Sequence, residues 1–265
     1  MSRFTTTQII ALVMMGAMAV FILGVPLLPF YDPYTQGLGS GLLPMNSYSF
    51  DGKYYLLGTD PLGRDLLSRL ALAGRVSVLI GTGAVAISLV IGVTLGLIAG
   101  YFRGPVETAV MGLADLQLSI PRVLLLIAVT AIIGPSVISL TVILGLTSWV
   151  SYGRVARGMT LSLREREFIL SAKVQGASAT WNIRKHLLPN VLPQMLIVAS
   201  YEFGMIIVLE ASLSYLGLGV QPPLPSWGMM VAEGQNYLAL APHLAMLPSI
   251  ALFILVAGFQ FLSQA

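Results

Sequence analysis

Residues 76–102 read VSVLIGTGAVAISLVIGVTLGLIAGYF, a run of 27 residues without a charged side chain. A helix that crosses a lipid bilayer needs roughly 20 mostly apolar residues, so this segment is long enough. The whole chain of 265 residues has the same character, with 56% hydrophobic and 9% charged residues. Soluble domains carry roughly 25% charged residues, and disordered chains combine low hydrophobicity with high charge. The composition therefore excludes both classes and predicts an all-α, polytopic membrane protein in contact with a lipid bilayer.

The charges and the missing cysteines exclude several kinds of chemistry. The formal net charge of +3 is small, and in a membrane protein the placement of the positive residues matters more than their sum, so we expect no nucleic-acid partner. There are no cysteines, hence no disulfide, thiol catalysis or cysteine-ligated metal. The two histidines, His186 and His243, lie in separate segments, and no His-Glu-x-x-His motif occurs. We expect no metal site, no catalytic residue and no cofactor in this chain.

Five more segments have the length and hydropathy of membrane spans. The first follows Arg3 and resembles a signal peptide, but the apolar core of a signal peptide runs only about 7–15 residues and no small-x-small cleavage site follows, so we expect an uncleaved anchor. With residues 76–102 the count is six spans, the others being residues 9–28, 107–133, 137–154, 188–212 and 242–262.

The third span has to take in charged residues. Residues 123–153 carry no charge but are interrupted by the turn signal Gly134-Pro135-Ser136, and two spans do not fit between residues 123 and 153. A span that ends before Gly134 must begin near Glu107, which draws Asp115 and Arg122 towards the membrane. These two residues are seven apart, which on one continuous helix places them on the same face.

Charged side chains inside a membrane are costly and usually face a bundle interior or a water-filled cavity. We therefore take four of them as candidates for a translocation pathway: Asp115, Arg122, Glu202 and Glu210. An alternative is equally open, in which Asp115 lies near one membrane surface and Arg122 pairs with a neighbouring helix.

Three glycines in the second span repeat every four residues, Gly92, Gly96 and Gly100. Small residues at this spacing form a stripe along one helix face that lets another helix approach closely. We expect close packing there rather than a functional site.

The orientation follows from the lysines and arginines, which are enriched in cytoplasmic loops. Both termini are predicted to be cytoplasmic, because that arrangement puts nine of these residues inside and four outside. The inner set is Arg3, Arg103, Arg154, Arg157, Arg164, Arg166, Lys173, Arg184 and Lys185, and the outer set is Lys53, Arg64, Arg69 and Arg75.

Two segments are then expected outside the membrane on the outer side. Residues 29–75 are rich in turn residues and close with residues 63–70 (GRDLLSRL), whose spacing predicts an interfacial amphipathic helix. Residues 213–241 contain Pro222, Pro223 and Pro225, which forbid a regular helix, and Trp227, a residue type that favours a membrane surface. We divide the chain into an anchor and outer region, 1–75, and a five-helix core, 76–265.

The cytoplasmic loop 156–189 is basic and predicted to be helical over residues 161–176. Gly176-Ala177-Ser178 would end this helix, with Gly176 in a closely packed turn, and Pro189 would prevent a continuous helix into the next span. Such a helix across the mouth of a bundle can fit the groove of a partner protein. An ordinary solvated loop, positive because of the topology rule, is the alternative.

Three blocks carry a resemblance to a known family. Residues 171–176 (SAKVQG) followed by 186–190 (HLLPN) resemble the cytoplasmic signature of ATP-binding-cassette importer permeases, which reads Glu-Ala-Ala, three residues, Gly, and a Pro further on. Residues 57–65 (LGTDPLGRD) and 210–219 (EASLSYLGLG) with 221–228 (QPPLPSWG) are similar to the dipeptide, oligopeptide and nickel branch. Within that branch the chain resembles the second of the two permease subunits.

The resemblance implies a type I importer permease fold in the bacterial inner membrane. It implies a homologous partner permease, two cytoplasmic ATPase subunits that hold ATP and Mg²⁺, and an extracytoplasmic substrate-binding protein. This chain has no Gly-x4-Gly-Lys-Ser/Thr motif, since its Gly52-Lys53 pair is followed by Tyr54. It would act as half of the translocation pathway rather than as an enzyme. The coupling residues would be Glu167, Leu170, Ser171, Ala172, Lys173, Gly176, Ala177, His186 and Pro189, and those of the outer region Asp60, Gly63, Arg64, Asp65 and Arg69.

Two departures from the family pattern matter. Leu170 stands where the signature has Glu, and Glu167, one turn earlier, can point to a similar face. The family usually continues past the sixth span with a short charged tail, so we expect a truncation at Ala265. Di- and oligopeptides are the expected substrates, with a nickel or opine-like solute as the alternative. A structural or intramembrane-enzyme bundle is a different class, which no catalytic motif favours.

Overall fold

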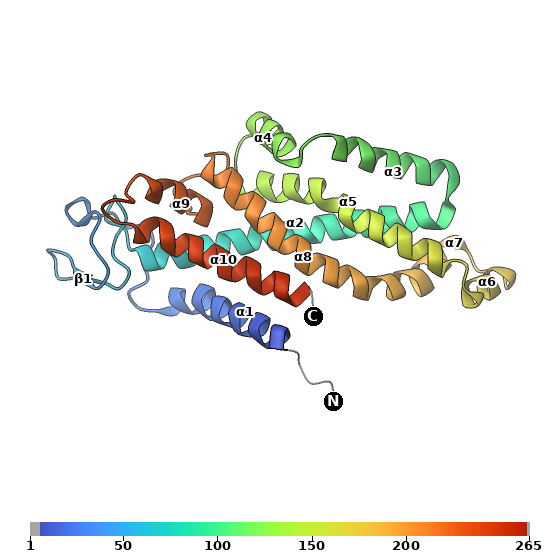
Figure 1. The fold of residues 1–265 in the computed structure, drawn as a ribbon, viewed down its shortest axis with the longest axis horizontal. Helices are drawn as coiled ribbons and strands as arrows, with labels where there is room; N and C mark the ends of the chain where they lie inside the picture. Colours follow the sequence, from blue (N-terminus) through green and yellow to red (C-terminus); the bar gives the residue numbers. More distant parts are fainter. Residues whose placement is uncertain (1–5, 264–265) are drawn as a thin grey trace.

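The computed structural model describes residues 6–263, so Arg3 and Ala265 lie outside the described part. It is an elongated bundle of helices (Figure 1), which confirms the all-α prediction. The long helices are α1 (Thr6–Gly24), α2 (Leu66–Phe102), α3 (Gly104–Ser119), α4 (Arg122–Ile133), α5 (Val137–Leu163), α8 (Leu188–Tyr215) and α10 (His243–Ser263). The shorter elements are η1 (Val25–Leu27), η2 (Leu38–Ser40), β1 (Ser47–Tyr48), β2 (Tyr54–Tyr55), α6 (Glu167–Val174), α7 (Ala179–Asn182), η3 (Ile183–Leu187) and α9 (Trp227–Gln235).

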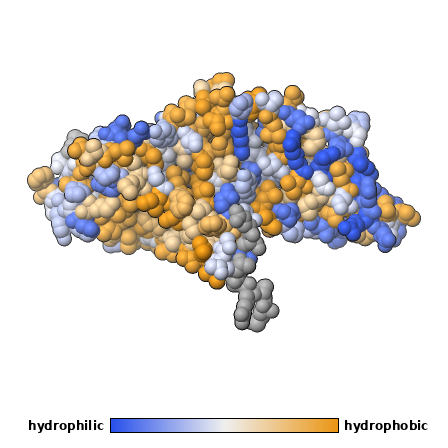
Figure 2. Space-filling model, viewed as in Figure 1, coloured by the Kyte–Doolittle hydropathy of each residue, from blue (hydrophilic) through white to orange (hydrophobic). Residues whose placement is uncertain are grey.

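The membrane spans are visible as long apolar helices. Within the described residues, five helices are long and apolar enough to cross a membrane, and there are six if the bent pair α3–α4 counts as one span. Figure 2 shows apolar side chains over much of the middle of the molecule and hydrophilic ones gathered at the end that carries α6 and α7. The structure is thus that of a multi-pass membrane protein.

The glycine stripe forms a close contact between α2 and α5. A Cβ atom at Gly92 would lie 2.4 Å from the carbonyl oxygen of Trp149, and one at Gly96 would lie 2.5 Å from that of Gly153, both on α5. The stripe continues to Gly100, where a Cβ would lie 2.7 Å from the Cβ of Thr160. The prediction of close helix packing is confirmed, since only glycine lets the two backbones come this near.

The third span is broken, and the prediction that Asp115 and Arg122 share one helix face is wrong. α3 and α4 meet at an angle of 88°, with the break at Ile120 and Pro121. A residue before proline is disfavoured in the helical conformation, and Ile120 is extended, with φ of −99° and ψ of 128°. Asp115 lies on α3 and Arg122 begins α4, so the two side chains have different environments.

The amphipathic helix that we predicted over residues 63–70 is instead the start of α2. Asp65 is its N-cap and accepts a hydrogen bond from the backbone N–H of Ser68, and the helix then continues without a break to Phe102. The boundary between residues 75 and 76 therefore lies inside α2. The residues from Leu66 to Ala71 are all buried, because α8, α9 and α10 pack against this helix.

Trp227 is wrong as a membrane-surface residue, since it is fully buried at the start of α9. Its indole Nε1–H donates a 2.9 Å hydrogen bond to the carbonyl oxygen of Leu70, which ties α9 to α2.

We expect Trp227→Phe to lower the melting temperature of the purified protein. Phe keeps most of the apolar ring but loses the hydrogen bond to Leu70, which is worth about 1 kcal/mol. Trp181→Phe is the matched control, because that ring is 46% exposed and surface changes stay within about 0.5 kcal/mol. An equal melting temperature for both variants would contradict the structural role of Trp227.

Pro189 does not interrupt the helix, contrary to the prediction. Helical structure runs from Ala179 to Tyr215, and the five residues just before α8, Ile183–Leu187, form a π-helical turn. A π turn changes which carbonyls are bonded, so a proline at the following N-terminal position is tolerated there. Because α5 also extends to Leu163, the irregular part of the loop 156–189 is shorter than predicted.

The two ends of the bundle are built differently (Figure 1). The β1–β2 hairpin, in which Ser47 pairs with Tyr55 and Tyr48 with Tyr54, lies at one end together with α9. α6 and α7 lie at the opposite end. The two regions that the sequence placed on opposite sides of the membrane are therefore far apart in the structure.

Candidate functional site

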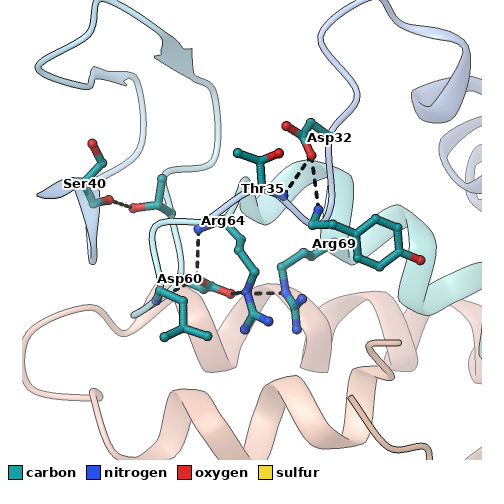
Figure 3. A network of polar contacts seen from close by, with 9 residues as sticks. Asp32, Thr35, Ser40, Asp60, Arg64 and Arg69 are labelled. Carbon is teal, nitrogen blue, oxygen red and sulfur yellow. Dashed lines mark hydrogen bonds and ion pairs between the residues drawn. The ribbon is translucent and has the colours of Figure 1, made fainter. Parts of the chain in front are cut away.

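Three of the predicted outer residues, Asp60, Arg64 and Arg69, meet in one buried ion network at the hairpin end (Figure 3), while Asp65 caps α2 through Ser68. The carboxylate of Asp60 binds two guanidinium groups through its Oδ2 atom, that of Arg64 at 2.6 Å and that of Arg69 at 3.2 Å. Its Oδ1 accepts backbone N–H bonds from Leu62 at 2.9 Å and Arg64 at 3.0 Å. Arg69 is only 2% exposed. A single carboxylate thus holds two buried cations.

The other residues of this network fix the backbone around it. Gly63 has a φ of +74°, and a Cβ there would lie 1.9 Å from the carbonyl oxygen of Gly37, so only glycine fits. Glu233 on α9 faces the same cluster, and burial raises the pKa of its carboxyl, while the nearby Arg69 and Arg64 oppose the rise. The sequence did not single out Glu233, and its only signal was a lone acidic residue in the loop 213–241.

Asp32 stabilises a turn in the same outer region of the chain (Figure 3). Its Oδ1 accepts backbone N–H bonds from Tyr34 at 3.2 Å and Thr35 at 3.0 Å, the pattern of an Asx turn. Burial raises the pKa of this carboxyl, but these hydrogen bonds and the charge of Lys53 outweigh it, so the pKa is lower than usual.

At the opposite end, α6 exposes a face of mixed polar and apolar side chains. Ile169 is fully buried and anchors the helix. Glu167 and Leu170, which is 48% exposed, line one surface hollow, completed by Ser171, Val174 and Gln175. Glu167 therefore shares a face with Leu170, as its position one turn earlier suggested.

The remaining predicted loop residues support this helix. The Lys173 ammonium lies 4.9 Å from the ring centroid of Tyr101 at the end of α2, and His186 packs edge-on against Trp181 with ring centroids 4.8 Å apart. Ala172 and Ala177 are half-buried, and the backbone N–H of Ala177 donates to the carbonyl of Ala172 at 2.9 Å. Pro189 is exposed at the start of α8.

Gly176 is exposed rather than closely packed, so that prediction is wrong for the chain by itself. Its φ is +86°, and a Cβ would meet no described atom within 4 Å. Glycine is required here by the left-handed backbone of the turn after α6, not by lack of room.

Inside the bundle, Arg122 faces Glu202. The Arg122 Nη2 atom lies 3.8 Å from the Glu202 Oε2 atom and also donates to the hydroxyl of Ser148 on α5. Glu202 is 3% exposed, whereas the Arg122 side chain is 30% exposed.

The other charged candidates lie elsewhere. Asp115 is exposed and pairs with Arg154 at 2.6 Å, while Glu107 on α3 pairs with Arg157 on α5. Glu210 is fully buried and accepts hydrogen bonds from the hydroxyls of Ser77 at 2.9 Å and Ser214 at 2.7 Å. The structure therefore brings Arg122 together with Glu202 and separates both from Asp115 and Glu210.

Membrane-length helices, an apolar middle and polar structures at both ends define a multi-pass membrane protein, and the sequence comparisons identify its kind. Residues 92–262 match the family described as binding-protein-dependent transport system inner membrane component, and the chain belongs to that family. It is a transport subunit of the inner membrane.

The names of similar proteins give different substrates: glutathione, dipeptides and nickel. The glutathione transport system permease protein GsiD of Pectobacterium atrosepticum is 39% identical over 78% of this chain and 69% of its own length. The dipeptide transport system permease protein DppC of Haemophilus influenzae is 33% identical over 97% and 87%, and the nickel transport system permease protein NikC of Escherichia coli is 35% identical over 89% and 83%. The resemblance to the second permease subunit of this branch is confirmed.

The fold is also similar to a solved structure, an inward-facing conformation of the MetNI methionine ABC transporter. The TM-score is 0.59 at 19% identity, and the match covers 74% of this chain and 93% of the other. This confirms the importer permease fold.

Proposed function

We propose that the chain is one of two permease subunits of an ATP-driven importer of di- and oligopeptides and forms half of its translocation pathway. The observation that carries the proposal is the similarity to dipeptide and glutathione permeases over most of the chain. The nickel permease supports a second candidate, a nickel or other small-solute importer of the same branch.

The proposed partners are a homologous permease, two cytoplasmic ATPase subunits and an extracytoplasmic substrate-binding protein. ATP and Mg²⁺ would be bound by the ATPase subunits, because the sequence of this chain lacks a phosphate-binding loop. Membership of a binding-protein-dependent transport family supports an assembly of this kind.

We place the α6–α7 end in the cytoplasm and the hairpin end outside. Basic residues gather at the α6–α7 end, where Arg103 pairs with Glu165 at 3.6 Å and Arg164 donates to the Tyr101 carbonyl at 2.6 Å. Basic loops favour the cytoplasmic side. The first described residue of α1 and the last of α10 both lie away from the hairpin (Figure 1), which supports cytoplasmic termini.

In this orientation α6 would seat in a groove of an ATPase subunit. The exposed face formed by Glu167, Leu170 and Ser171 would make the contact, and the turn at Gly176 would border it. Movement of α6 would pass to the bundle through buried Ile169 and the Lys173–Tyr101 contact. Such a contact can bias a two-state equilibrium between helix packings.

We expect Gly176→Trp to uncouple ATP hydrolysis from transport while the chain still inserts and assembles. A Cβ at Gly176 meets no described atom within 4 Å, so we expect a large side chain there to obstruct a docked partner. Substrate-stimulated ATPase activity and uptake are measured in the reconstituted complex.

Gly176→Ala is the matched control. It carries the same left-handed strain, about 1–2 kcal/mol, without the bulk, so it should keep coupling. Normal stimulated ATPase activity and uptake in Gly176→Trp would show that α6 is not the docking helix.

For the pathway we retain Arg122 and Glu202, because they face each other between α4 and α8. Hydrocarbon does not solvate a guanidinium, so the exposed part of Arg122 must meet water or a polar partner surface. Asp115 and Glu210 stay weaker candidates, because the first is paired at the surface and the second is enclosed by serine hydroxyls.

A further inference from the structure

The site formed by Arg122 and Glu202 inside the bundle contains polar atoms that have no hydrogen-bond partner in the described residues. Arg122 comes from α4, Tyr152 from α5 and Glu202 from α8. Tyr152 is fully buried on α5, one helical turn after Ser148, whose hydroxyl accepts a hydrogen bond from Arg122. Two atoms of the charged pair have no hydrogen-bond partner in residues 6–263, namely Arg122 Nε and Glu202 Oε2.

The ion pair in the cluster is looser than a purely structural pair would be. Burying two charges costs more than their attraction returns unless direct hydrogen bonds satisfy them. The exposed Arg154–Asp115 pair has such contact at 2.6 Å, yet the Arg122–Glu202 pair, in which Glu202 is buried and Arg122 half-buried, is separated by 3.8 Å. The pair that most needs direct hydrogen bonds therefore has none between its members, and both charges keep donor and acceptor sites for a ligand.

We propose that Arg122, Tyr152 and Glu202 form an intramembrane binding site for a zwitterionic substrate. The substrate carboxylate would bind the Arg122 guanidinium, its ammonium group would bind Glu202, and the Tyr152 hydroxyl would bond to the same groups. This inference rests on the proposed function of peptide import.

Charge balance explains why a zwitterion suits this site. With substrate absent, Arg122 and Glu202 neutralise each other. When a zwitterion binds, its carboxylate pairs with Arg122 and its ammonium group pairs with Glu202, so every charge keeps a partner. A substrate with a single charge would leave either Arg122 or Glu202 unpaired in a low-dielectric region. The site would therefore favour substrates that carry both charges.

The test uses the complete transporter in liposomes, with its partner permease, ATPase subunits and binding protein, and the dipeptide Ala-Ala as the probe. The reversed pair Arg122→Glu/Glu202→Arg and the apolar pair Arg122→Met/Glu202→Met leave no single charge stranded. We expect both variants to assemble with normal yield. We expect their rate of Ala-Ala uptake to be lower by about tenfold or more, because each loses a hydrogen bond between a charged group and the substrate.

The reversed pair Glu107→Arg/Arg157→Glu is the matched control, because it exchanges an ion pair outside the cluster. It should keep both yield and uptake. Uptake near the wild-type level in either Arg122/Glu202 double variant would overturn the proposal.

A second measurement compares Ala-Ala with its C-terminal amide. The binding protein is the same in every complex, so its preference cancels when the uptake ratio of the two probes is compared between variants. We expect the apolar pair to reduce that ratio about tenfold, since the group that binds the carboxylate is gone. An unchanged ratio would contradict the assignment of Arg122.

Tyr152→Phe decides the case if the double variants do not assemble, because it removes a single hydroxyl and leaves both charges of the pair in place. Reduced uptake at normal yield would support the site, and normal uptake would overturn it. A wild-type complex that imports no Ala-Ala would instead contradict peptide import, which separates the two failures.

Discussion

Gly96→Leu should abolish assembly of the transporter. A Cβ at Gly96 would lie 2.5 Å from the Gly153 carbonyl oxygen and 2.7 Å from the Ala156 Cβ on α5. Overpacking a core typically costs about 1–3 kcal/mol when side chains can move aside. Here the obstacle is backbone, so the two helices themselves must separate. We expect a larger cost, measured as loss of complex yield and of a cooperative melting transition.

Gly16→Leu on α1 is the matched control. It makes the same change in another membrane-length helix, where a Cβ would have no described atom within 4 Å. Near-normal yield is expected for this variant. Equal yields of the Gly96 and Gly16 variants would mean that the stripe does not hold α2 against α5.

Asp60→Asn should have the second-largest effect. The change leaves the guanidinium groups of Arg64 and Arg69 without their shared counter-ion, and all three side chains are buried. Removing one partner of a buried pair costs about 3–5 kcal/mol, because the remaining charge is stranded. The expected result is a strongly lowered melting temperature, with protease cleavage in the loop 28–65.

Two further variants locate the effect. Arg69→Met should cost less than Asp60→Asn, because Asp60 keeps Arg64 as its partner and one Arg69 nitrogen, Nη1, is already unpaired among the described residues. Asp51→Asn is the control, since Asp51 is exposed in the same loop region. If Asp60→Asn melted at the same temperature as Asp51→Asn, the network would not stabilise this end of the bundle.

Some features of the fold could be predicted because they depend on local composition alone. A span needs only length and hydropathy, so the six apolar segments were readable without any tertiary contact. The glycine stripe was readable because a four-residue period puts small residues on one helix face. The turn at Gly176 was also correctly placed, although the reason for glycine there is backbone conformation and not packing.

Other features depend on neighbours that the sequence does not identify. Asp115 and Arg122 were placed on one face because their spacing fits a continuous helix, but the break at Pro121 separates them. That error had a local signal, since a residue before proline disfavours helix. The burial of Trp227 against Leu70 had no such signal, because the two residues are far apart in the chain and meet only through packing of α9 on α2.

The class of protein, the number of apolar segments and the three family blocks could all be predicted before any contact was known, because each is a property of contiguous residues. Which charges meet depends instead on the packing of distant segments. Arg122 faces Glu202 and not Asp115, and Asp60 holds Arg69 as well as Arg64. Charges inside a membrane bundle are stabilised by whichever opposite charge lies nearest in space, and that distance is set by helix packing and by the bend between α3 and α4.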